Sequence, residues 1–229
     1  MVLEQRISKA SQINQWYYEM NIFVGIDPSI NSTGVCILET DDNNKQVNCK
    51  FYIIKNGKLT KKESKAEDDN AKMFQYILYN KLDTSTKNIE DYKTLEWNKT
   101  QNMINVCECI KDIVFKYIAN YNGILNLYVC QEGISYGSTI KTKSVFDLAG
   151  LNYLLRNTFI NSSVCNYFVI AAPSEIKKFA TGKGNANKEM MVNMFSCIFP
   201  DLQLPKVDDI CDAYFMANYA SKLFEQGEI

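Results

Sequence analysis

One stretch near the start of the chain limits the possible folds more than any other. An apolar run from Ile22 to Ile26 ends at a single carboxylate, Asp27, and a second apolar run begins after Gly34. The turn between them is rich in Pro, Ser and Asn, so the pattern predicts a buried strand, a tight turn and a partner strand. A carboxylate at the end of a core strand is costly to desolvate unless a cation meets it. The alternative is that Asp27 only caps its own turn, which is an ordinary role for Asp.

Composition excludes several classes of function. The chain has 229 residues, of which 46% are hydrophobic, and this favours one domain over 1–229 with a substantial core. The 25 basic and 26 acidic residues nearly balance, so any DNA-binding surface must be a local patch. The chain has no His, which excludes a Ser-His-Asp triad, a His zinc site and a His general base.

The cysteines and the hydropathy pattern bear on the compartment. The eight Cys include no C-x-x-C pair, which disfavours zinc, and several lie inside apolar runs as expected of reduced core residues. No apolar run approaches the ~20 residues that a membrane-spanning helix needs. We therefore expect a cytoplasmic protein without a membrane partner, located in the host cytoplasm if a virus encodes it.

Hydrophobic periodicity predicts an α/β domain, a mixed five-stranded sheet with helices on both faces. The predicted strands are 22–27, 33–39, 47–55, 124–130 and 164–172, and the predicted helices are 91–119, 144–156, 173–179, 188–198 and 208–224. Residues 1–20 are interpreted as an N-terminal extension. Residues 56–90 form a polar, Lys-rich insertion, in which Met73, Phe74, Ile77 and Leu78 are interpreted as one short helical stripe.

Acidic residues recur where predicted elements end or begin. Glu132 follows an apolar strand as Asp27 does, so the two carboxylates meet if these strands are parallel neighbours. Asp209 and Asp212 share one flank of the last helix and can both face the sheet, whereas Asp208 is interpreted as a helix cap.

Carboxylates that converge without basic partners repel one another, and a divalent cation removes that conflict. Hard oxygen ligands without His or Cys predict Mg²⁺, with Mn²⁺ as a substitute. Two such ions can promote phosphodiester hydrolysis.

Three motifs in this order resemble those of the RuvC-like Holliday junction resolvases, especially the phage-encoded branch. They are Gly25-Ile26-Asp27-Pro28-Ser29 with Thr33-Gly34, Gln131-Glu132-Gly133, and Asp209-Ile210-Cys211-Asp212-Ala213. The resemblance implies a single RNase H-like nuclease domain, a homodimer, and paired nicking of four-way DNA junctions with two Mg²⁺ ions. It also implies that Asp27, Glu132, Asp209 and Asp212 are the catalytic, metal-binding carboxylates.

A basic segment after the last predicted strand, residues 173–184, also resembles that family. Its Gly-rich loop lets backbone amides approach a phosphate, although such a loop is often only a flexible turn. The candidates for contacts with the DNA backbone are Lys141, Lys143, Lys183 and Lys188. Tyr136 can stack on an opened base, or it can simply pack.

The leading hypothesis is a structure-selective endonuclease that acts on four-way and other branched DNA. One alternative is a non-catalytic RNase H-like DNA-binding or scaffold protein, against which the four carboxylates argue. Another is a nucleotide-binding domain of the actin-like or sugar-kinase type, because Asp27 with Ser32, Thr33 and Gly34 also resembles the first phosphate loop of those proteins. With 229 residues and ten Gly, the chain has little room for the second domain and second Gly-rich loop that they require.

Overall fold

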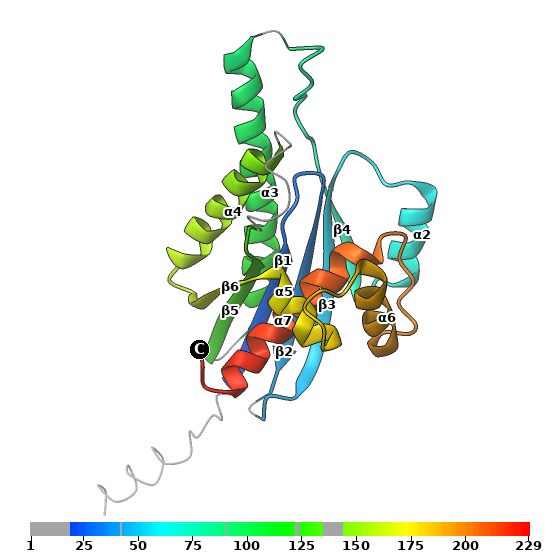
Figure 1. Cartoon of the computed structure of the whole chain (residues 1–229), viewed down its shortest axis with the longest axis vertical. Helices are drawn as coiled ribbons and strands as arrows, with labels where there is room; N and C mark the ends of the chain where they lie inside the picture. The colour runs from blue at the N-terminus through cyan, green and yellow to red at the C-terminus, as the bar shows by residue number, and fades with distance from the viewer. Residues whose placement is uncertain (1–18, 42, 90, 122–123, 135–143) are drawn as a thin grey trace, which may run out of the picture.

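A mixed six-stranded sheet forms the centre of the fold (Figure 1). The computed structural model describes residues 19–41, 43–89, 91–121, 124–134 and 144–229. In chain order the elements are β1 (Glu19–Asp27), β2 (Ser32–Thr40), β3 (Gln46–Asn56), α2 (Lys61–Asp69), β4 (Phe74–Tyr79), α3 (Tyr92–Ile118), β5 (Ile124–Glu132), α4 (Ser144–Ile160), β6 (Cys165–Ala171), α5 (Pro173–Thr181), α6 (Lys188–Ile198) and α7 (Val207–Glu225). Across the sheet the strands follow the order β4-β3-β2-β1-β5-β6.

The strand directions bring the ends of β1 and β5 to one edge of the sheet. β1, β2 and β3 form an antiparallel meander, as the sequence predicts. β5 pairs with β1 in parallel, and β6 pairs with β5 in parallel. The carboxyl ends of β1, β5 and β6 therefore lie at the same edge, where sites gather in α/β sheets.

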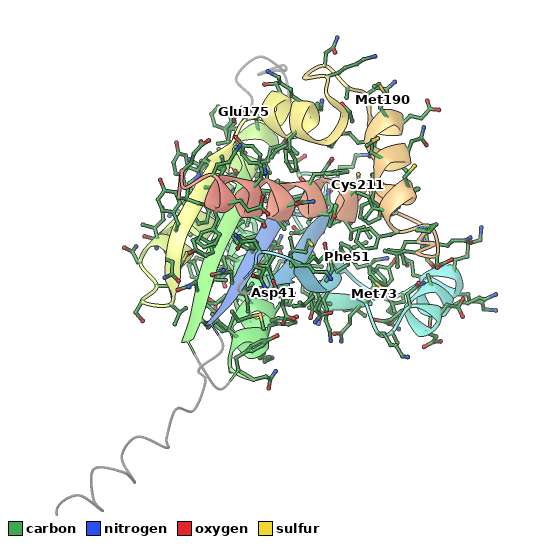
Figure 2. The ribbon with its side chains drawn as sticks, turned by 90° about the horizontal axis from the view of Figure 1, so that it is seen from below. Asp41, Phe51, Met73, Glu175, Met190 and Cys211 are labelled. Atoms are coloured by element: carbon green, nitrogen blue, oxygen red, sulfur yellow. The ribbon has the colours of Figure 1, made fainter. Side chains whose placement is uncertain are left out.

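Helices cover both faces of the sheet. Helix α7 lies along one face with α5 and α6 beside it (Figure 2). The apolar core on that face includes Phe23. Helices α3 and α4 cover the opposite face, where Ile22, Val24 and Ile26 are buried. Side chains of β1 thus alternate between two separate cores, which explains the unbroken apolar run from Ile22 to Ile26.

The strand β4 corrects the sequence interpretation of the insertion. The helical stripe assigned to Met73, Phe74, Ile77 and Leu78 is wrong, and this is why the sheet has six strands instead of five. Residues 74, 76 and 79 are buried while 75 and 78 are exposed, so side chains at 74–76 alternate as in a strand. β4 pairs in parallel with β3 at the end of the sheet, and α2 connects the two strands. The edge of β3 supplies hydrogen-bond partners that no local pattern reveals.

Helix α3 matches its prediction closely. Asp91 caps it, accepting hydrogen bonds from the backbone nitrogens of Lys93 and Thr94, and the first part of the helix extends past the sheet (Figure 1). Most of the N-terminal extension predicted over 1–20 lies outside the described residues. None of the helices described is long and apolar enough to cross a membrane.

Candidate active site

Asp27 and Glu132 occupy adjacent positions at the carboxyl edge of the sheet. Ile26 pairs with Gln131 in the parallel register, so Asp27 and Glu132 are the next residues along neighbouring strands. Because side chains alternate along a strand, Asp27 shares the face of Phe23, and Glu132 shares the face of Tyr128. Both aromatic side chains belong to the core beneath α7. The two carboxylates therefore point to the same side, as the sequence predicts.

Two glycines let α7 press against this edge. A Cβ atom on Gly34 would overlap the backbone carbonyl of Asp209, and one on Gly25 would overlap that of Ala213. Gly34 is also the antiparallel partner of Asp27. The first turns of α7 therefore lie directly over the end of β1. This close approach brings Asp209 and Asp212 to the carboxylates of the sheet.

Electrostatic interactions link Asp27 to three other carboxylates. Burial raises the pKa of Asp27 well above its usual range, and the charges of Asp212, Glu132 and Asp209 raise that pKa further. Burial likewise raises the pKa of Glu132, with Asp212 contributing. Burial is also the largest cause of the raised pKa values of Asp209 and Asp212. We call these four side chains, Asp27, Glu132, Asp209 and Asp212, the acidic cluster.

Two carboxylates in the first turn of α7 have polar partners. The Ser32 hydroxyl donates a hydrogen bond to Asp209 Oδ2. Asp208 forms an ion pair with Lys188, the first residue of α6. The sequence interpretation of Asp208 as a cap is wrong, because the N-cap of α7 is Lys206 and Asp208 lies in the first turn. Its negative charge still suits the positive end of that helix.

The donor set fits a hard divalent cation. Within the described residues, no member of the acidic cluster forms an ion pair with a Lys or Arg. No three Asp, Glu or Cys side chains of that part of the chain converge closely enough to hold a metal ion as they stand. The Asp209 carboxylate accepts a hydrogen bond from Ser32, and like charges oppose a closer approach of carboxylates to one another. A cation among these oxygen ligands would reverse the repulsion, and Mg²⁺ and Mn²⁺ prefer such ligands.

Three lysines direct charge at the acidic cluster, namely Lys177, Lys188 and, at Asp209, Lys206. Lys188, a predicted DNA contact, lowers the pKa values of Asp27 and Asp212, although burial dominates both. Lys177 acts in the same way on Glu132 and Asp212. The sequence places Lys177 only within a general basic segment. Glu132 pairs with Ala171 at the end of β6, and α5 begins two residues later. This connection brings Lys177 on α5 to the edge of the sheet where Glu132 lies.

Of the other predicted DNA contacts, only Lys183 lies within the described residues. Lys183 is exposed in the loop after α5, where Gly182 adopts a left-handed conformation with a φ of +77° that favours glycine. Tyr136, Lys141 and Lys143 lie outside the described residues.

Comparison with solved structures identifies the fold. No family model and no curated protein matches the sequence. The structure resembles RuvC of Thermus thermophilus with a TM-score of 0.52 at 13% identity, over 91% of this chain and 96% of that one. It also resembles T. thermophilus RuvC in complex with a Holliday junction substrate, with a TM-score of 0.51 at 11% identity, over the same shares of the two chains. This protein therefore has the RNase H-like fold of the RuvC-type Holliday junction resolvases.

Proposed function

We propose that this protein is a metal-dependent endonuclease that cuts four-way and other branched DNA junctions by paired nicks. The observation that carries the proposal is the acidic cluster, in which three elements bring four carboxylates together without a basic ion-pair partner among the described residues. Holding like charges together in a buried site costs free energy, and such groups are found mainly at functional sites. The fold supports the same proposal, since T. thermophilus RuvC has been solved with a Holliday junction substrate.

The residues of the site have two tasks in this proposal, which are to bind metal ions and to orient one of the carboxylates. Asp27, Glu132, Asp209 and Asp212 hold two Mg²⁺ ions, with Mn²⁺ as a substitute. Divalent cations supply a more acidic water and stabilise charge on the leaving oxygen of a phosphodiester. Ser32 orients the Asp209 carboxylate through its hydrogen bond.

The lysines bind the DNA backbone in this proposal. Asp208 keeps Lys188 beside the acidic cluster, where Lys188 and Lys177 can meet the oxygens of a phosphate. Lys183, Lys141 and Lys143 extend the contact along the strand, and Tyr136 stacks on an opened base. Paired nicks need two active sites facing opposite strands of a junction, which a homodimer provides.

Cleavage of a labelled synthetic four-way junction in Mg²⁺, beside linear duplex of the same sequence, tests the proposal. The native protein should nick the junction symmetrically, and Asp27→Asn should abolish cutting. Asp68→Asn is the matched control, because Asp68 is an exposed aspartate on α2. Binding of the junction by the native protein without cutting, in Mg²⁺ and in Mn²⁺, would overturn the nuclease proposal and favour a scaffold role.

A further inference from the structure

A cavity of about 350 Å³ lies beside the loop that follows Asp27. Residues from that loop, the insertion and α4 line it, among them Pro28, Asn31, Lys81, Thr84, Asp147 and Leu148. We propose that this cavity receives one unpaired nucleobase of the branched DNA and prefers a base that carries an exocyclic amine. The inference rests on the proposed function, which supplies DNA as the ligand.

The walls of the cavity are fixed by hydrogen bonds between distant segments. The buried amide of Asn102 on α3 accepts from the backbone nitrogen of Leu82 at 2.7 Å and donates to its carbonyl oxygen at 3.0 Å. Lys81 Nζ donates to Asn31 Oδ1 at 2.6 Å, and the Tyr79 hydroxyl donates to the carbonyl oxygen of Ile30. The insertion, α3 and the loop after Asp27 therefore form a preorganised pocket, and an occupant would touch the loop that leads from the acidic cluster.

The charges that line the cavity favour a neutral ligand over a phosphate. Lys99 lies 2.8 Å from Glu96 and 3.9 Å from Asp147, so two carboxylates surround this cation. Lys81 is the other cation of the lining and Asp147 is its one carboxylate, and Glu96 outside the lining pairs with Lys99, so these two basic and two acidic groups balance. Pro28, Ile30 and Leu148 add apolar surface. Apolar walls with a few fixed polar groups are typical of pockets for small planar ligands.

Three polar groups of the lining remain available to a ligand. In the described part of the chain no group donates a hydrogen bond to the Asp147 carboxylate, whose cation Lys99 is too distant for one. The same residues offer no acceptor to Asn31 Nδ2 or to the Thr84 hydroxyl.

A carboxylate only accepts hydrogen bonds, so Asp147 favours bases with exocyclic N–H groups. Adenine, cytosine and guanine have such groups, whereas thymine has none. Removing a base from the stack costs least where it is already poorly paired, as at a branch point.

Binding of a fluorescent four-way junction tests the inference. Every protein carries Asp27→Asn so that cutting does not deplete the DNA, and a single abasic site is moved through the positions around the exchange point. One position should be sensitive, with affinity reduced about tenfold by the abasic site and by thymine. Leu148→Trp fills the cavity and should remove this sensitivity. Phe146→Trp on the same helix is the matched control, because Phe146 is 77% exposed and does not line the cavity.

A second variant tests the base preference. Asp147→Asn should make thymine equal to the amine-bearing bases at the sensitive position and should preserve the penalty of the abasic site. A flat abasic scan, or a sensitive position that Leu148→Trp leaves unchanged, would overturn the pocket while junction binding persists. If no protein binds the junction more tightly than duplex of the same sequence, both the pocket and the proposed function fail.

Discussion

A side chain on Gly25 would collide with the backbone of Ala213, because α7 crosses β1 at this point with no room for a Cβ atom. The same added atom would lie 2.5 Å from the backbone nitrogen of Ala217. Backbone atoms cannot rotate away as a flexible side chain can. The distance between α7 and β1, and with it the spacing of Asp27 from the helix carboxylates, is therefore set by a glycine outside the acidic cluster.

Gly25→Ala should consequently damage both stability and activity. We expect a loss of about 1–3 kcal/mol or more in the free energy of unfolding, as for overpacked cores, and reduced cleavage even at temperatures where the variant is folded. Chemical denaturation and junction cleavage measure the two effects. Gly150→Ala is the control, because its Cβ would meet only the flexible side chain of Met103. Equal behaviour of the two variants would contradict the close packing of α7.

Removing a charge from the acidic cluster should stabilise the metal-free protein. Burial and three neighbouring carboxylates raise the pKa of Asp27, so its charged form is disfavoured in the folded state. At neutral pH, Asp27→Asn should therefore raise the free energy of unfolding by about 1 kcal/mol or more. Thermal denaturation in a chelator compares the variant with the native protein. A lower Tm for the variant would show that the carboxylates do not repel one another.

With a divalent cation bound, the native protein should become more stable than Asp27→Asn. At about 100 times its Kd, a cation adds about 2.7 kcal/mol, or roughly 5–10 °C in Tm for a chain of this size. Native protein should gain this stability from Mn²⁺, and Asp27→Asn should gain much less. Asp68→Asn should respond like the native protein. No shift with Mn²⁺ in the native protein would count against the acidic cluster as a metal site.

The insertion contains a carboxylate whose contribution to stability depends on pH. Burial favours the neutral form of Glu63, but hydrogen bonds from Lys55 and Thr60 outweigh burial and lower its pKa below 4.5. A lowered pKa in the folded state stabilises the protein above about pH 4.5, and this contribution is lost as the pH falls through the folded-state value.

At neutral pH we expect Glu63→Gln to cost about 2 kcal/mol. The difference from the native protein should shrink in acid. Glu108→Gln should change little at any pH, because its ion pair with Lys111 is on the surface. A constant cost of Glu63→Gln across the pH range would exclude the ion pair as its cause. Urea denaturation at several pH values provides the measurement.

Two tyrosines of β4 offer a matched pair of hydroxyl deletions. The Tyr79 hydroxyl donates to the carbonyl oxygen of Ile30 in the loop after Asp27, whereas the buried Tyr76 hydroxyl has no hydrogen-bond partner among the residues that the structure describes. Tyr79→Phe should lose about 1 kcal/mol and slow junction cleavage, because the loop beside the acidic cluster loses an anchor. Tyr76→Phe should be neutral or stabilising and should leave cleavage unchanged. Identical cleavage rates in both variants would show that the insertion does not support the loop.

The sequence predicts the acidic cluster better than the surroundings of that cluster. Asp27 and Glu132 each end an apolar run, and only the parallel pairing of β1 with β5 had to be assumed to bring them together. Asp209 and Asp212 follow from helical spacing on α7. Each of these placements needs only a local period and one rule of sheet topology, and the parallel pairing of β1 with β5 confirms that topology.

What the sequence does not predict depends on partners that are distant in the chain. β4 has a mixed apolar pattern that suits a helix equally well, and only the free edge of β3 decides for a strand. Lys177 has no local feature that separates it from the adjacent Lys178, and only the end of β6 directs it to Glu132. The link from Tyr79 to Ile30 joins residues 49 positions apart. Such contacts arise from tertiary packing, which can override local propensity.

The pairing of β4 with β3 also bears on the solubility of the chain. Without β4, the backbone of β3 from Phe51 to Asn56 would present a row of unpaired hydrogen-bonding groups beside apolar side chains. Such an open edge recruits strands from other molecules and promotes aggregation. Deleting the insertion to obtain a smaller protein should therefore yield a chain that associates with itself, and this would obscure any effect on the acidic cluster.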